Sequence, residues 1–199
     1  MRFYIFLFIL TFTSNLFAQK DWQLKKNTEG IKVYYRSAVD SDVKELKIVT
    51  EIEASPDAIM KILGDASKHP DWIYSCASTK VLEKKSEDEI YFYDVLDFPW
   101  PMNDRDIIGH LVVTKDAAGT ITTVNNAAPN YIPKKKDIVR IKESKATWIL
   151  TPQMDGSTNM TYFLRSHPGG ALPAWVVNLV IDRGPVQSVK KLKTLVKRG

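Results

Sequence analysis

Apolar and charged residues alternate along several stretches of this chain, and a period of two is typical of strands that bury one face. Two early stretches, 31–36 and 45–52, predict a hairpin that follows a short turn or helix at 21–22. After residue 78 the pattern is of strands alone, separated by turn sequences such as 116–119. This succession predicts an antiparallel meander of strands at 79–84, 89–97, 106–114, 120–125, 138–151 and 158–166.

Helical spacing appears in two places. Ser55, Pro56 and Asp57 are typical of a helix start, with an N-cap hydroxyl, a proline in the first turn and an acid at the positive end of the helix dipole. The second helix is predicted at 173–196, where the apolar side chains fall close to one face. At about 1.5 Å per residue it is long enough to cross a whole domain. Pro185 is expected to kink it.

These elements predict an α+β protein in which a curved antiparallel β-sheet wraps around a long C-terminal α-helix. The 199 residues, 44% hydrophobic and 26% charged, suffice for one domain at 19–199 with a sizeable core. The formal net charge of +5 is too small an excess to indicate a nucleic-acid partner.

The first 18 residues differ from the rest of the chain. Arg2 precedes an apolar run of about ten residues, and the small Ala18 precedes a polar sequence that begins at Gln19. These are the regions of a signal peptide, so the chain is expected to be exported, periplasmic or secreted, after cleavage near Ala18. An uncleaved N-terminal anchor is the alternative. The single cysteine, Cys76, is expected to be buried and inert, and an intermolecular disulfide is the alternative.

Two segments are more specific than the strand and helix pattern. The first reads Phe-Pro-Trp-Pro-Met-Asn-Asp-Arg-Asp at 98–106, and the second reads His-Pro-Gly-Gly-Ala-Leu-Pro-Ala-Trp at 167–175. Together with Trp22, Arg140 and Trp148, they resemble START domains, the lipid-transfer family related to the steroidogenic acute regulatory protein. The resemblance implies a helix-grip fold whose tunnel, between the sheet and the C-terminal helix, holds one lipid, sterol or related molecule. Transfer of that ligand between membranes is the use it implies.

The resemblance also implies a movable lid, formed by the loop at 98–104 and the start of the terminal helix. Phe98, Trp100 and Met102 would offer apolar surface to a ligand or a bilayer when the lid opens. The alternative is a rigid aromatic corner that packs the strand ends.

Sterol-carrying relatives often pair an acidic and a basic side chain on adjacent cavity strands. Asp94 shares a strand face with Phe92 and is the candidate acid, but no base occupies the matching position on the next strand. A buried unpaired carboxylate is costly. Asp94 is therefore expected to face water, to take a proton, or to meet a donor such as His110 or Arg105.

Strand parity and the helix face predict which side chains line the tunnel. Arg105, Tyr162 and Asn178 are expected to orient a polar head group, and tryptophan in place of Leu179 is expected to block lipid uptake. The predicted ligand-binding residues are Phe92, Asp94, Leu96, Trp100, Met102, Arg105, Trp148, Leu150, Met160, Tyr162, Leu164, Trp175, Asn178 and Leu179.

No catalytic residue, metal or cofactor is expected. His69, His110 and His167 do not fall at metal-ligand spacing, and no serine lies in a nucleophile elbow. Two alternatives to a lipid carrier remain: a helix-grip enzyme of the cyclase or hydrolase kind, and an interaction module whose cavity is filled by side chains.

Lysine runs suggest where a membrane could be touched. Lys134, Lys135 and Lys136, with the lid loop, would give a monomeric protein transient contact with an anionic bilayer. The alternative is that these lysines, and the run at 190–198, are solvated ends of a turn and of a helix.

Overall fold

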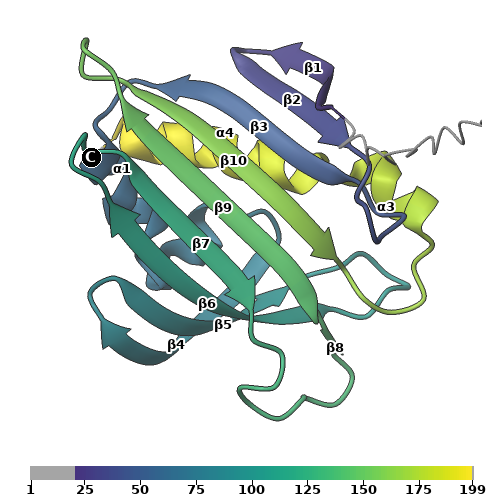
Figure 1. The fold of residues 1–199 in the computed structure, drawn as a ribbon. Coiled ribbons are helices and arrows are strands. Elements are labelled where there is room, and N and C mark those ends of the chain that lie inside the picture. Colours follow the sequence, from purple (N-terminus) through teal and green to yellow (C-terminus); the bar gives the residue numbers. More distant parts are fainter. Residues whose placement is uncertain (1–20, 199) are drawn as a thin grey trace, which may run out of the picture.

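A strongly bent antiparallel sheet wraps around the C-terminal helix in the computed structural model, which describes residues 21–198 (Figure 1). Neighbouring strands follow the order β1-β2-β3-β10-β9-β7-β6-β5-β4, and the short β8 pairs in parallel with β6. The predicted α+β helix-grip architecture is confirmed. The strands are β1 (Gln23–Thr28), β2 (Ile31–Arg36), β3 (Glu45–Ile52), β4 (Cys76–Ser86), β5 (Glu89–Leu96), β6 (Arg105–Lys115), β7 (Ile121–Ala127), β8 (Val139–Arg140), β9 (Glu143–Pro152) and β10 (Thr158–His167).

The predicted meander forms the larger part of the sheet, and β10 closes it by pairing with β3 of the predicted hairpin. The stretch predicted as one strand at 138–151 is divided into β8 and β9. Alternate side chains of β3, β9 and β10 point inward and meet α4, which explains why the sequence alternates there. The centre of this core contains the fully buried Leu46, Ile48, Leu150, Met160 and Leu192.

The prediction of a turn or helix at 21–22 is wrong, because these residues have no regular structure and lead directly into the edge strand β1. All six residues of β1 are exposed, so no apolar alternation marks it in the sequence. The strand pairs with β2 through its backbone.

Three short helices lie between β3 and β4, and the first of them forms as the capping residues predict. These are α1 (Pro56–Leu63), the 3₁₀ turn η1 (Ala66–Lys68) and α2 (His69–Trp72). The Ser55 side chain accepts a hydrogen bond from the Ala58 backbone N–H at 3.3 Å, and Pro56 is the first helical residue. Trp72 is buried against the core, which places α2 beside one end of the sheet.

The C-terminal helix is broken rather than kinked. The prediction of one helix at 173–196 is wrong, because two helices occupy this stretch: α3 (Ala174–Val180) and α4 (Arg183–Val196). Pro185 therefore lies in the first turn of α4. A proline is tolerated there because the first N–H groups of a helix have no intrahelical partner. Only α4 is gripped by the sheet: Val189 and Leu192 are fully buried, whereas α3 has no buried residue.

The export signal predicted at 1–18 lies outside the described residues. Within residues 21–198, no helix combines the length and apolar character needed to span a membrane.

Candidate ligand cavity and lid

A cavity of about 250 Å³ lies between the concave face of the sheet and the helices α2 and α4. Its wall is mostly apolar, and it runs from the strand ends at Leu96, Ile107 and Ser166 to a deep end at Leu63 and Leu111. The volume is just below the roughly 300–1,000 Å³ of ordinary small-molecule sites. The remaining lining residues are His69, Trp72, Ile73, Tyr74, Phe92, Asp94, Asn125, Ile141, Ser144, Ala146, Trp148, Tyr162, Leu164, Gly184, Pro185 and Ser188.

The structure brings six of the predicted ligand-binding residues onto this wall: Phe92, Asp94, Leu96, Trp148, Tyr162 and Leu164. Leu150 and Met160 instead lie in the packed core, fully buried beneath α4. On the inward face of the sheet they are the next residues beyond Trp148 in β9 and Tyr162 in β10, where the lining of the cavity ends. Strand parity finds the correct face of the sheet but not the length of the cavity.

The remaining predicted residues gather where the strands end, around the lid. Trp100 on the loop at 97–104 and Trp175 and Leu179 on α3 are 92%, 67% and 71% exposed. Met102 is half-buried in the same loop. Because Leu179 faces solvent, tryptophan there would not fill the cavity.

Asn178 and Arg105 hold the lid region together instead of facing a head group. The Asn178 side-chain amide donates to the Asp42 carbonyl oxygen and its oxygen accepts from the Lys44 N–H, both at 2.9 Å. These bonds tether α3 to the loop between β2 and β3. The buried Arg105 guanidinium donates to the carbonyl oxygens of Asn103 and Pro168 and lies 4.3 Å from the Phe98 ring centre. It thereby joins the two lid segments.

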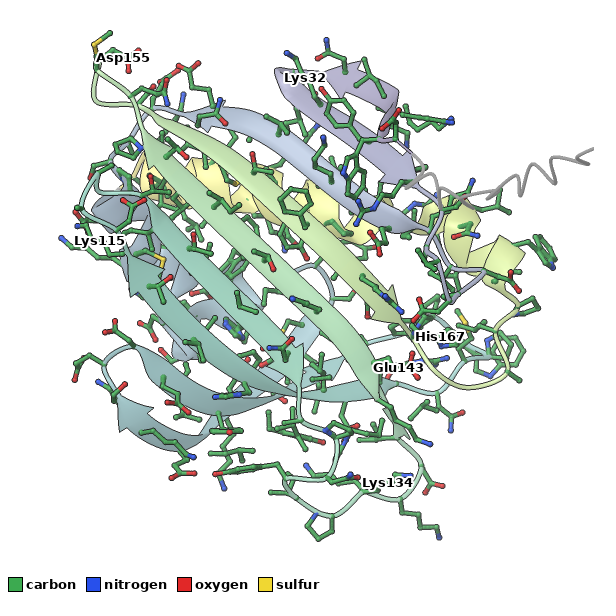
Figure 2. The ribbon with its side chains drawn as sticks, viewed as in Figure 1. Lys32, Lys115, Lys134, Glu143, Asp155 and His167 are labelled. Atoms are coloured by element: carbon green, nitrogen blue, oxygen red, sulfur yellow. The ribbon has the colours of Figure 1, made fainter. Side chains whose placement is uncertain are left out.

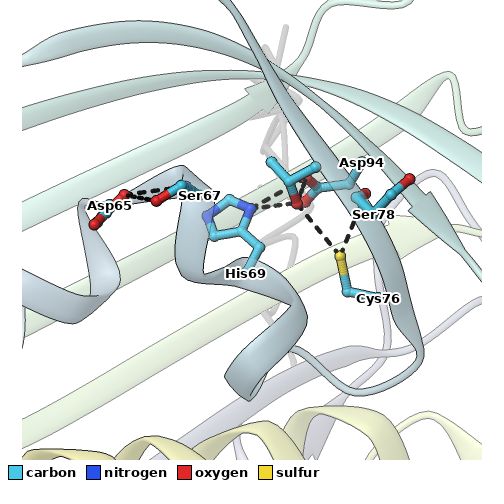
Figure 3. A network of polar contacts seen from close by, with 7 residues as sticks. Asp65, Ser67, His69, Cys76, Ser78 and Asp94 are labelled. Atoms are coloured by element: carbon cyan, nitrogen blue, oxygen red, sulfur yellow. Dashed lines mark hydrogen bonds and ion pairs between the residues drawn. The ribbon is translucent and has the colours of Figure 1, made fainter.

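Asp94 is buried in the cavity wall, and its partner is a residue that the sequence did not suggest. His69 on α2 donates from Nδ1 to both Asp94 carboxylate oxygens, at 2.9 and 3.2 Å, and the Thr79 hydroxyl donates at 2.7 Å (Figure 3). Of the three alternatives, Asp94 meets a donor, but this donor is neither His110 nor Arg105. His110 contacts Glu89 instead, with Nε2 2.9 Å from Oε1.

Two further polar atoms of the wall have no partner among residues 21–198. The indole N–H of Trp72 and the amide Oδ1 of Asn125 are both buried without a hydrogen bond. These two atoms are exceptions, because buried polar groups are nearly always satisfied.

Cys76 lies beside this network, with Sγ 3.5 Å from the Thr79 hydroxyl. Burial, and secondarily the negative charge of Asp94, raises the pKa of the Cys76 thiol to about 11. The thiolate is the nucleophilic form, so the raised pKa supports the prediction of an inert cysteine.

We predict that iodoacetamide alkylates Cys76 in the native protein at a rate on the order of a hundredfold below that of the urea-unfolded chain. Both rates are measured by mass spectrometry at one mildly alkaline pH. Equal rates would show that the Cys76 thiol is neither shielded from the reagent nor raised in pKa.

The predicted lysine cluster lies on the loop between β7 and β8. Lys134, Lys135 and Lys136 are exposed, and Figure 2 shows Lys134 on this loop and His167 at the end of β10. Lys134, His167 and Gly170 line one shallow depression, so the loop lies next to the segment that leads into α3. Lys134 thus lies beside the lid segment at 167–170.

Comparison with known proteins agrees with this geometry. The START domain family model matches residues 11–198. An uncharacterized protein of Pseudomonas aeruginosa is 33% identical over 179 residues, covering 90% of this chain and 88% of that protein. Mouse phosphatidylcholine transfer protein is 24% identical over 180 residues, covering 86% and 82%. The crystal structure of a STAR-related lipid transfer protein from Xanthomonas axonopodis has a TM-score of 0.83 at 34% identity, covering 88% of this chain and 98% of that one.

Proposed function

The chain belongs to the START domain family, and from that premise we propose that it binds one lipid in the cavity and carries it between membranes. The observation that carries the proposal is the mostly apolar cavity that reaches Leu96 and Ser166, the strand ends that lead into the exposed aromatic lid. Apolar pockets with a few convergent polar groups are typical of small-molecule binding. The phosphatidylcholine transfer proteins among the relatives support a lipid as the ligand.

The polar groups of the wall favour an uncharged polar group on that lipid. No lysine or arginine of the described chain lines the cavity, and a buried phosphate without a cation would be costly. The Asp94 carboxylate is already satisfied by His69 and Thr79. A hydroxyl or carbonyl group, in contrast, needs no counter-ion in this mostly apolar cavity.

The two ends of the cavity differ, and the difference gives the ligand a direction. Asn125 lies opposite Leu111 at the deep end, whereas the lid exposes Trp100 and Trp175 to solvent at the other end. We propose that the polar group enters first and that the hydrocarbon remains beneath the lid.

The experiment that tests this proposal fills the cavity. Ala146 lies on the wall, and Ala146→Trp is expected to lower lipid uptake roughly a hundredfold because the indole would occupy the ligand's space. Thr147→Trp is the matched control, since neighbouring strand positions face opposite sides of the sheet. Binding is measured by displacement of a fluorescent diacylglycerol. Equal uptake by wild type and Ala146→Trp would overturn the cavity as the binding site.

The exposed lid residues and the nearby lysines support a membrane-contacting role for this end of the molecule. A Trp100→Ser/Trp175→Ser variant is expected to slow lipid transfer between vesicles about tenfold while equilibrium uptake stays unchanged. Met154→Ser is the control, because Met154 is equally exposed but lies in the turn between β9 and β10, away from the lid. Loss of uptake in the double variant, without a specific loss of transfer rate, would contradict a docking role.

We favour binding over catalysis as the role of the cavity. Asp94 orients the His69 ring as it would in a catalytic dyad, but within residues 21–198 no hydroxyl or thiol is hydrogen-bonded to His69. Burial raises the pKa of the neighbouring Cys76 thiol, so this thiol is a poor nucleophile. We also propose that the chain acts outside the cytoplasm as a monomer, after removal of residues 1–18. N-terminal sequencing and gel filtration of the protein from its native host test both points.

A further inference from the structure

A thin hydrophobic partition separates the cavity from a second hollow. An open groove of about 700 Å³ lies between α1, η1 and the strands β4 to β6. Leu111 lines both the cavity and this groove. It belongs to a small hydrophobic cluster with Ala66, Ile90 and Phe92 that is separate from the main core. At Leu111, therefore, one side chain stands between the two spaces.

On its cavity side this partition is tightly packed, and it includes one polar side chain. Asn125 lies directly opposite Leu111 in the β6–β7 register, and its Oδ1 is buried without a hydrogen-bond partner. The Phe92 ring and Asn125 Oδ1 both lie over Gly109, where an added Cβ would stand 2.2 and 2.6 Å from them. The wall at this end of the cavity is therefore tightly packed.

The groove side of the partition is charged. The ion pair between Lys115 Nζ and Asp57 Oδ1, at 2.8 Å, joins β6 to α1 beside the groove, and Lys84 pairs with Glu87 at 2.7 Å on its other rim. A hydrocarbon chain would gain little from such an open, charged surface, whereas a hydroxylated group would find partners and water.

We infer that Leu111 is a specificity-determining residue that limits the size of the polar group accepted at the deep end of the cavity. The groove is the space that a larger polar group would enter if this side chain were shortened. The inference rests on the proposed function and on the direction proposed for the ligand.

The test compares lipids that differ in one part only. One series keeps the acyl chains fixed and enlarges the head group from diacylglycerol to monoglycosyl diacylglycerol; a second keeps the glycerol head group and lengthens the chains. Leu111→Ala is expected to raise the affinity for the glycosylated lipid, relative to diacylglycerol, roughly tenfold and to leave the chain-length preference unchanged. Adding Val113→Phe, which fills the groove beyond Leu111, should reverse the gain.

Leu46→Ala is the control for lost packing, because Leu46 is fully buried but lines neither space. An unchanged head-group ratio in a Leu111→Ala protein that still binds diacylglycerol would overturn the inference and leave the proposed function standing. A shift in chain-length preference instead would show that Leu111 faces the hydrocarbon, and would overturn it as well. If wild type and all variants bind neither lipid series, the proposed function fails and the inference with it.

Discussion

Arg140→Met is expected to lower the free energy of unfolding by about 3–5 kcal/mol, because it leaves a buried carboxylate without its partner. Arg140 and Asp106 form a two-bond pair, Nε to Oδ1 at 2.6 Å and Nη2 to Oδ2 at 2.9 Å, and both side chains are almost wholly buried. The guanidinium also donates to backbone carbonyl oxygens in the loop between β7 and β8, among them that of Pro129 at 2.7 Å. Urea unfolding followed by tryptophan fluorescence measures the loss.

Two further variants separate charge from geometry. Arg140→Lys keeps the cation but loses the planar fork, so its loss should be intermediate. Asp106→Leu/Arg140→Met removes both charges and should be more stable than Arg140→Met alone, since an ion pair replaced by apolar side chains costs little. A double variant no more stable than the single one would show that the unpaired charge is not the cause.

His69→Leu is expected to cost roughly 2–4 kcal/mol, because Asp94 would keep only the Thr79 hydroxyl as a partner in a buried site. The same change should weaken binding of diacylglycerol, since the unpaired carboxylate would draw water into the cavity. Thermal unfolding and displacement of the fluorescent lipid measure the two effects.

The matched variant for this pair is His69→Leu/Asp94→Leu. It removes the carboxylate as well, so stability should recover most of the loss. If the single and double variants are equally unstable, the lost packing of His69 against Phe92 and Trp72, and not the unpaired charge, explains the effect.

Periodicity predicts most of this fold because one face of each central strand is buried. The alternation in β3, β9 and β10 follows directly from contact with α4. Periodicity fails at β1, whose exposed side chains follow no pattern, and at 181–182, where the C-terminal helix breaks. The apolar residues of α3 have the spacing expected if α3 and α4 were one helix with a continuous apolar face. Only the tertiary structure shows that the α3 residues are exposed at the lid.

The sequence predicts which face of a strand lines the cavity, but not which residues of other elements contact that face. The parity of β5 identified Asp94 as a cavity residue, but its partner His69 lies 25 positions earlier on α2, where no spacing rule connects the two. Arg105 and Asn178 were predicted as polar cavity residues because of their chemistry. Their backbone partners, which determine that they hold the lid together, are distant in sequence: Asn178 bonds to Asp42 and Lys44, and Arg105 bonds to Pro168.

Native mass spectrometry of residues 19–199, purified without detergent and followed by organic extraction, tests whether the protein carries a lipid. We expect a discrete added mass that matches one uncharged, hydroxyl-bearing lipid, and its absence from Ala146→Trp. A protein that is bare as purified, and that then takes up neither diacylglycerols, sterols nor phospholipids, would contradict the carrier function.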